Sequence, residues 1–209
     1  MDKKYTYDFN NKKGLLSKLR SYTEVPDDDN IRFKELIRQK LIHCPELLYA
    51  LHNETLKNEL FQPNGMLNID GEWDLYFGEN SNIRPFIYLP QTQECVENFL
   101  CYKLDFKETP KYNSVEKYMV LTFFIIAHGS DIIDKDTGIA RHDLIGAILR
   151  EYFNWSNIFG AQCHITSDVE GVTDNNYITR TMTLECTVPN GMVKTIGNKT
   201  DYINNEVRR

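Results

Sequence analysis

The chain has 209 residues, a hydrophobic fraction of 41% and a net charge of −6. A globular chain of this length buries a sizeable core without disulfide bonds, and its acidic balance argues against binding of nucleic acid over the whole surface. The longest apolar run, residues 118–127, is much shorter than the roughly 20 residues of a membrane helix, so we expect no contact with a membrane.

The N-terminal quarter has the pattern of several helices. Residues 13–22 form a short helical candidate, and residues 31–43 carry a stripe of apolar side chains at helical spacing. A third helix begins at Pro45, a residue that fits the first turn of a helix. A polar helix or loop follows at residues 54–61. We therefore predict a helical N-terminal region over residues 1–65.

The pattern then changes to one of β-strands. Short strands are predicted at residues 73–77 and 83–89, which are separated by the turn-forming sequence GENSN. Residues 98–107 alternate between two faces, as in a half-buried strand. Residues 118–127 are apolar at nearly every position, which favours a central strand that is covered on both faces.

One long helix and a closing hairpin complete the pattern. A broad apolar face predicts a helix at residues 139–153, and the preceding segment DKDTG supplies candidate capping residues. Two β-like segments follow, AQCHITSDVEG and residues 177–189, and the second is the clearest antiparallel strand of the chain.

These elements predict an α+β fold, with N-terminal helices and then a mostly antiparallel sheet packed by one long helix, closed by a C-terminal β-hairpin. The α+β domain covers residues 66–190, and the polar tail of residues 191–209 is expected to be loosely ordered. The five scattered cysteines contain no Cys-x-x-Cys pair, and we expect reduced, partly buried thiols. The N-terminus lacks an apolar signal core, so we expect that the protein is not exported.

Arg141, His142 and Asp143 form the most suggestive polar triplet. Consecutive residues of a helix point about 100° apart, so the adjacent His and Asp do not orient one another as a catalytic dyad requires. No serine or cysteine occupies a nucleophile elbow. We therefore expect an interface or structural role for the triplet, and the candidate interface also includes Asp168 and Asp174.

The residue spacing predicts no metal or cofactor site. The adjacent pairs at residues 43–44 and 163–164 combine His and Cys, but neither has the ligand spacing of a zinc site. Asp131, Asp134 and Asp136 lack the central glycine and distal glutamate of a calcium-binding EF-hand loop, so helix capping is the better account. Phosphate-cradling sequences such as GxGxxG are absent from the sequence.

Other polar residues leave alternatives open. Asp105-Phe106-Lys107, with Glu72 and Asp74 upstream, resembles the Asp/Glu-x-Lys arrangement of metal-dependent nucleases, in which carboxylates hold a divalent ion and the lysine assists the attacking water. The N-terminal basic residues form either a solvated helix face or a contact with an acidic partner or DNA backbone. These basic residues are Lys3, Lys4, Lys12, Lys13, Lys18 and Arg20.

The order of elements, together with the segments IAHG, TGIARHDLIGAILREYFNW and YITRTMTLECTVPN, resembles the tail terminator and related neck proteins of tailed bacteriophages. The resemblance covers residues 83–190. In that family a small α+β domain assembles as a ring, usually a hexamer, which stops growth of the tail tube and joins the tail to the head connector. The helical region of residues 1–65 is not part of the minimal family pattern, and this leaves open another position as a neck or tail adaptor.

The resemblance implies a non-enzymatic structural protein of the virion, which is present in the host cytoplasm during assembly. Its implied partners are copies of itself, the tail tube, the head–tail connector, and genomic DNA that passes through the ring without sequence recognition. An acidic or neutral lumen suits this passage, because like charges keep the duplex from sticking. Ring closure needs heterologous interfaces, and the candidates are the exposed side of the helix carrying Arg141, His142 and Asp143 and the hairpin at residues 168–176. A regulatory module that binds a host protein is the third class of function.

Overall fold

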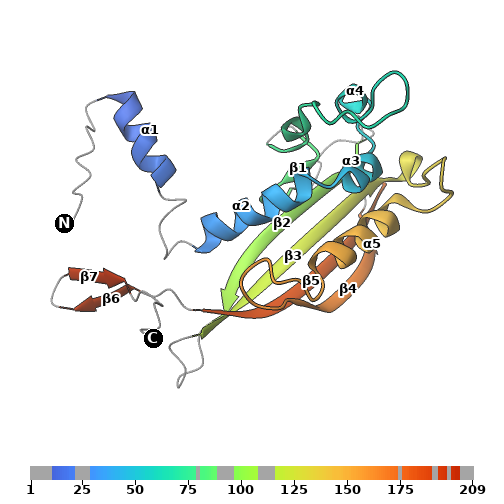
Figure 1. The fold of residues 1–209 in the computed structure, drawn as a ribbon. Coiled ribbons are helices and arrows are strands. Elements are labelled where there is room, and N and C mark those ends of the chain that lie inside the picture. Colours follow the sequence, from blue (N-terminus) through green and yellow to red (C-terminus); the bar gives the residue numbers. More distant parts are fainter. Residues whose placement is uncertain are drawn as a thin grey trace.

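The computed structural model describes residues 11–21, 29–78, 81–88, 97–107, 116–173, 176–189, 193–196 and 199–202. The predicted α+β fold is confirmed (Figure 1), because N-terminal helices precede a five-stranded, mostly antiparallel sheet against which one long helix packs. None of the helices described is both long and apolar enough to cross a membrane.

The elements follow in chain order. The helices are α1 (Lys12–Ser21), α2 (Asp29–Ile42), α3 (Pro45–Leu51), α4 (Lys57–Leu60) and α5 (Arg141–Phe153), with short 3-10 helices η2 (Trp73–Tyr76) and η3 (Gly129–Asp131). The strands are β1 (Ile83–Arg84), β2 (Phe99–Lys107), β3 (Glu116–His128), β4 (His164–Val172), β5 (Tyr177–Pro189), β6 (Val193–Ile196) and β7 (Lys199–Tyr202).

The main sheet has the strand order β1-β2-β3-β5-β4. All its pairs are antiparallel except β1 with β2, and β3 pairs along its whole length with β5. A β-bulge between Ile165 and Ser167 shifts the register of β4 against β5. The mostly apolar β3 therefore lies at the centre of the sheet, as its sequence predicts.

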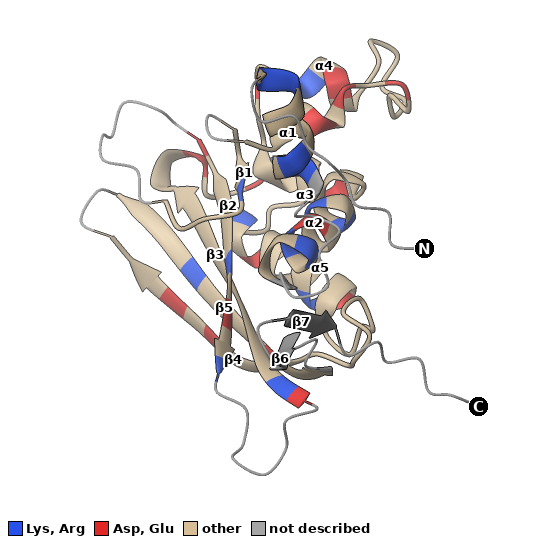
Figure 2. Ribbon diagram, turned by 90° about the vertical axis from the view of Figure 1, so that its left-hand side faces the viewer, with Lys and Arg blue, Asp and Glu red and all other residues tan. Residues whose placement is uncertain are grey.

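One face of the sheet carries the core. Alternate side chains of β2, β3 and β5, such as Leu100, Phe123 and Leu184, are buried together with Leu149 of α5 and Ile37 of α2. Figure 2 shows the helices on this side of the sheet. Complete burial of each such side chain contributes roughly 1.5–3 kcal/mol. This shared core joins α2, α3 and α4 to the sheet.

No described helix covers the other face. A small second cluster lies at one end of it, where the guanidinium of Arg84 lies 3.8 Å from the ring centroid of Tyr88. The buried members of this cluster are Phe99, Cys101, Ile126 and Tyr177. Beyond the cluster, β5 presents half-buried threonines, including Thr181 and Thr183. The prediction that β3 is covered on both faces is correct for most of the strand, since Val120, Thr122 and Ile126 on this face are buried; Phe124 is half-buried and Tyr118 is exposed.

Three predicted elements differ from those observed. Residues 73–77 form η2 instead of a strand, because local i→i+3 hydrogen bonds and the indole of Trp73, which donates to the carbonyls of Glu59 and Asn68, hold the segment in a turn. Of residues 83–89, β1 takes only the first two. The tail contains the paired strands β6 and β7 where loose order was expected.

The start of α5 also departs from the prediction. The helix begins at Arg141, and its N-cap residue, Ala140, makes no side-chain capping bond. The carboxylate of Asp134 accepts hydrogen bonds from the backbone N–H and the hydroxyl of Thr137, at 2.9 and 2.7 Å. Asp134 therefore closes the turn before the helix and does not cap it.

Candidate functional site

Two residues of the predicted interface triplet do not lie on the exposed side of α5. Arg141 and His142 are only 3% and 7% exposed, so the expectation that they face solvent is wrong. Arg141, in the first turn of α5, packs against η3 and the end of α3, whereas the ring of His142 lies near Glu170 of β4. Asp143 is partly exposed. Asp174, the last predicted interface residue, lies outside the described residues.

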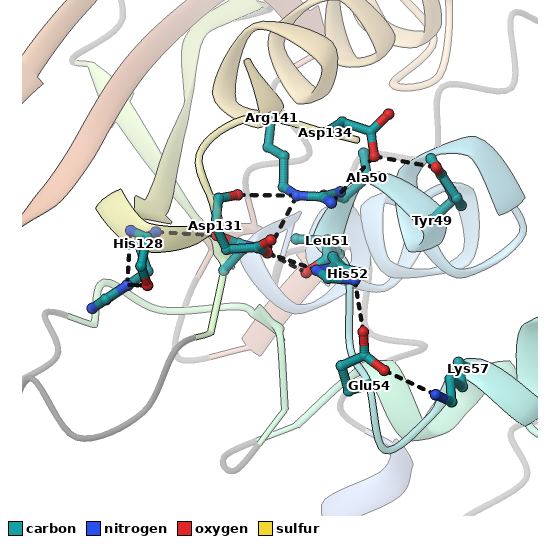
Figure 3. A network of polar contacts seen from close by, with 12 residues as sticks. Tyr49, Ala50, Leu51, His52, Glu54, Lys57, His128, Asp131, Asp134 and Arg141 are labelled. Carbon is teal, nitrogen blue, oxygen red and sulfur yellow. Dashed lines mark hydrogen bonds and ion pairs between the residues drawn. The ribbon is translucent and has the colours of Figure 1, made fainter. Parts of the chain in front are cut away.

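Arg141 is the centre of a buried polar network (Figure 3). Its Nε donates to the backbone carbonyl of Asp131 at 3.0 Å and lies 3.2 Å from the carboxylate of the same residue. Its Nη2 lies 3.2 Å from Oδ1 of Asp134, a side chain that is almost fully buried. A further bond reaches the carbonyl of Ala50 in α3. One cation thus joins three segments of the chain.

The same network continues to the end of α3. Nδ1 of His52 lies 2.7 Å from Oδ2 of Asp131, and Nδ2 of Asn98 donates to the same oxygen at 2.9 Å. His52 adopts a positive φ of 51°, which ends α3 and turns the ring toward Asp131. Burial raises the pKa of Asp131, but the bonds from His52 and Asn98 and the charge of Arg141 outweigh it, so the pKa lies below its ordinary value.

The carboxylates of this network are already bound by cations and donors. Tyr49 donates to Asp134 at 3.1 Å and to Asp136 at 2.5 Å, and the pKa of Tyr49 is raised first by the bond to Asp136 and then by burial. A carboxylate held in this way is a poor general base, because its basicity is lowered by each bond that it accepts. The network therefore fixes the corner between α3, η3 and α5.

A second cluster brings Asp143 and Asp168 together through Arg180. Arg180 of β5 donates from Nε and Nη2 to the two carboxylate oxygens of Asp168, both at 2.8 Å, and from Nη1 to Asp143 at 2.5 Å. Arg150 of α5 also donates to Asp168, at 2.7 Å. The bond from Arg180 holds the pKa of Asp168 below its ordinary value. These pairs fasten α5 to the β4–β5 hairpin.

Sequence reasoning missed Arg180 as the organiser of this cluster, although a signal existed. An arginine stands among the apolar positions of β5, where a charge needs partners from the elements packed against it. Gly146 of α5 makes room for it, since a Cβ at this position would lie 2.9 Å from Cζ of Arg180.

One group of described residues has the types and the spacing of metal ligands. Nε2 of His142 lies 3.7 Å from carboxylate oxygens of both Asp143 and Glu170, and Nδ1 of His142 is buried without a hydrogen-bond partner. The Asp143 oxygen already accepts from Arg180. A divalent ion there would be repelled by the guanidinium, so we assign no metal to this group.

The residues of the nuclease alternative do not converge. Asp105 lies on the face without helices and pairs with Lys103 at 2.7 Å, and Lys107 pairs with Glu185 at 2.6 Å. Asp74 pairs instead with Arg38 of α2, which packs on the opposite face of the sheet. The described residues therefore contain no carboxylate cluster around Lys107.

Among the described strands, β4 forms an unpaired edge of the sheet. No described strand lies beyond β4, and most of its side chains are exposed, with Val169 and Val172 among the exposed large hydrophobic residues. The exposed ring of Trp155 stacks on His164 at the start of this strand, with ring centroids 5.7 Å apart. An unpaired strand edge with apolar side chains favours pairing with another chain.

Comparison with known proteins places the chain in a family. A search of the curated proteins found no match. A family model described as YomW matches residues 45–186, which run from the start of α3 through most of β5 and include both the Arg141 network and the Arg180 cluster. Because the match covers more than half of the chain, the chain belongs to the YomW family.

Proposed function

We propose that the chain is a structural subunit of a tailed bacteriophage that assembles with copies of itself into a ring. In this proposal the ring, a hexamer by analogy with tail terminators, caps the tail tube and joins it to the head connector. The protein acts in the virion neck, and in the host cytoplasm during assembly. The proposal assigns no catalytic residue and no cofactor.

The unpaired edge of β4 is the observation that carries the proposal. Stable monomers protect edge strands with charges, bulges or covering segments. β4 has a bulge near its start and the exposed Glu170, but beyond the bulge it still exposes Val169 and Val172, and no described segment covers this part of the edge. The Arg180 cluster fastens this hairpin to α5, so the edge is held as a rigid element. A rigid strand edge on every copy is suited to a repeated contact between neighbours.

The charge of the chain agrees with a ring that DNA traverses. A net charge of −6 per subunit disfavours retention of a duplex by the ring, because the repulsion acts on every subunit alike. In this view the tail tube and the connector are recognised by protein surfaces, and the genome only passes through. Placing the subunit elsewhere in the neck or tail changes these partners but not the contact between copies.

Mass photometry and negative-stain microscopy test the proposal. Purified protein, alone and mixed with purified tail tubes, is expected to form rings and to bind tube ends. The variant Val169→Lys, Val172→Lys, which places charges along the β4 edge, is expected to abolish rings, whereas Ile133→Lys on an exposed loop should leave them intact. A protein that stays monomeric at high concentration, with and without tail tubes, refutes the proposal. Rings that bind the connector but not the tube favour the adaptor position.

A further inference from the structure

The first helix leaves its apolar stripe uncovered. Leu15, Leu16 and Leu19 of α1 are between 40% and 52% exposed. Leu15 and Leu19 are four residues apart, and Leu16 and Leu19 three apart, so the three side chains share one face of the helix. Figure 1 shows α1 standing apart from the sheet. An isolated helix of ten residues is marginal in water, so this stripe needs a surface to pack on.

A groove of suitable character lies beside the C-terminal end of α2. It has a volume of about 760 Å³ and lies between α2 and the segment that contains η2. Ile42, Trp73 and Leu75 contribute apolar walls, and Ile69 at its rim is 82% exposed. The volume is in the range of clefts that take a ligand, and the groove is large enough for several leucine side chains.

The charges of the helix and of the groove have opposite sign. Lys12 and Lys13 are exposed in the first turn of α1. Asp70 and Glu72 are exposed beside the groove, and neither forms a salt bridge with a described residue. Basic side chains flanking a leucine stripe thus correspond to acidic side chains flanking an apolar groove. Such complementarity gives a contact both its attraction and its specificity.

We propose that α1 of one copy docks in the α2–η2 groove of a second copy. The leucines of α1 fill the groove, and Lys12 and Lys13 face Asp70 and Glu72. The inference rests on the proposed function, because it specifies how neighbouring subunits of the ring are joined. One patch meets a different patch on the next copy, which is the heterologous contact that ring closure requires.

The groove is not lined by α1 of the same chain, and this leaves it free for a second copy. The groove is lined by Gln39, Ile42 and His43 at the C-terminal end of α2, whereas α1 precedes the N-terminal end of that helix. The fourteen residues of α2 separate these ends by about 20 Å. Figure 1 shows α1 near the N-terminal end of α2, away from α3 and α4.

Exchange of charges between the two surfaces tests the docking. One variant carries Lys12→Glu and Lys13→Glu, and the other carries Asp70→Lys and Glu72→Lys. Each alone sets like charges against each other and is expected to weaken self-association by at least about 10-fold in sedimentation experiments. An equimolar mixture restores assembly, because the acidic α1 of the first variant fits the basic groove of the second. Lys135→Glu and Glu151→Lys, both exposed and outside the groove, are the matched controls.

The outcomes separate this inference from the proposed function. If wild type forms rings and both charge variants do so equally well, the docking is refuted and the ring survives. If each variant loses assembly but the mixture does not regain it, contact with a second copy is refuted. If wild type stays monomeric with and without tail tubes, both proposals fail. The docking is also overturned if the protein binds anionic lipid vesicles and Leu19→Asp abolishes this binding but leaves ring formation intact. In that case α1 recognises a membrane surface.

Discussion

Replacement of Arg141 by methionine removes the cation from a buried network. The side chain is 3% exposed, and its two carboxylate partners, Asp131 and Asp134, have side chains only 13% and 2% exposed. Methionine keeps most of the volume but leaves both carboxylates without their cation and two backbone carbonyls without a donor. Removal of one partner from a buried ion pair costs about 3–5 kcal/mol. That loss is a large part of the 5–15 kcal/mol that is typical of a whole domain.

Urea unfolding followed by circular dichroism measures this loss. Arg150→Met is the matched control, because Arg150 is half exposed and pairs at the surface, and a loss of at most about 1 kcal/mol is expected for it. The double variant Arg141→Met, Asp134→Asn should regain about 1–2 kcal/mol relative to Arg141→Met, since the amide leaves one fewer uncompensated charge. A loss at Arg141 no greater than that at Arg150 would contradict the reasoning.

Three further predictions concern Gly146, Asp168 and Cys44. Gly146→Ala should destabilise the fold by about 1–3 kcal/mol in urea unfolding, because its Cβ meets the guanidinium of Arg180, and should be neutral or stabilising in the background Arg180→Met. The lowered pKa of Asp168 contributes stability that is present above the ordinary aspartate pKa of about 3.9 and is lost as the pH falls through the folded-state pKa. The variant Asp168→Asn should therefore lose less free energy of unfolding than wild type between neutral and acidic pH. An equal loss in the two proteins would contradict the role given to Asp168. Burial raises the pKa of Cys44 to about 11, so its thiol should react with Ellman's reagent at pH 8 only after unfolding; a fast phase that Cys44→Ser removes would disprove this.

Helices and strands with a clear periodicity of apolar side chains were predictable from the sequence. The alternation over residues 98–107 is that of β2, in which Leu100, Tyr102 and Leu104 share the face that is buried under the helices. The strand is more than half-buried, because Phe99 and Cys101 of the other face are buried in the second cluster. The segment of η2 was not predictable in this way. Its aromatic residues favour a strand, but the indole of Trp73 donates to carbonyls 14 and 5 residues earlier in the chain, and these bonds select a tight turn.

The polar clusters were harder to predict from the sequence than the sheet. Burial of Arg141 depends on Asp131 and Asp134, whose positions are set by the turn between β3 and α5 and not by any repeat in the sequence. Arg180 was a usable indication of such a cluster, because it is a charged residue among the apolar positions of an alternating strand. Its partners, however, lie on α5 and β4 and become neighbours only when the hairpin packs against the helix.

The most direct test of the central claim is the mass of the assembled protein at the end of a tail tube. Electron microscopy of tubes mixed with the wild-type chain, together with mass photometry of the free protein, is expected to show a closed ring of identical subunits that caps the tube end. Tubes with bare ends, beside a protein of 24.5 kDa that remains a monomer at every concentration, would contradict it.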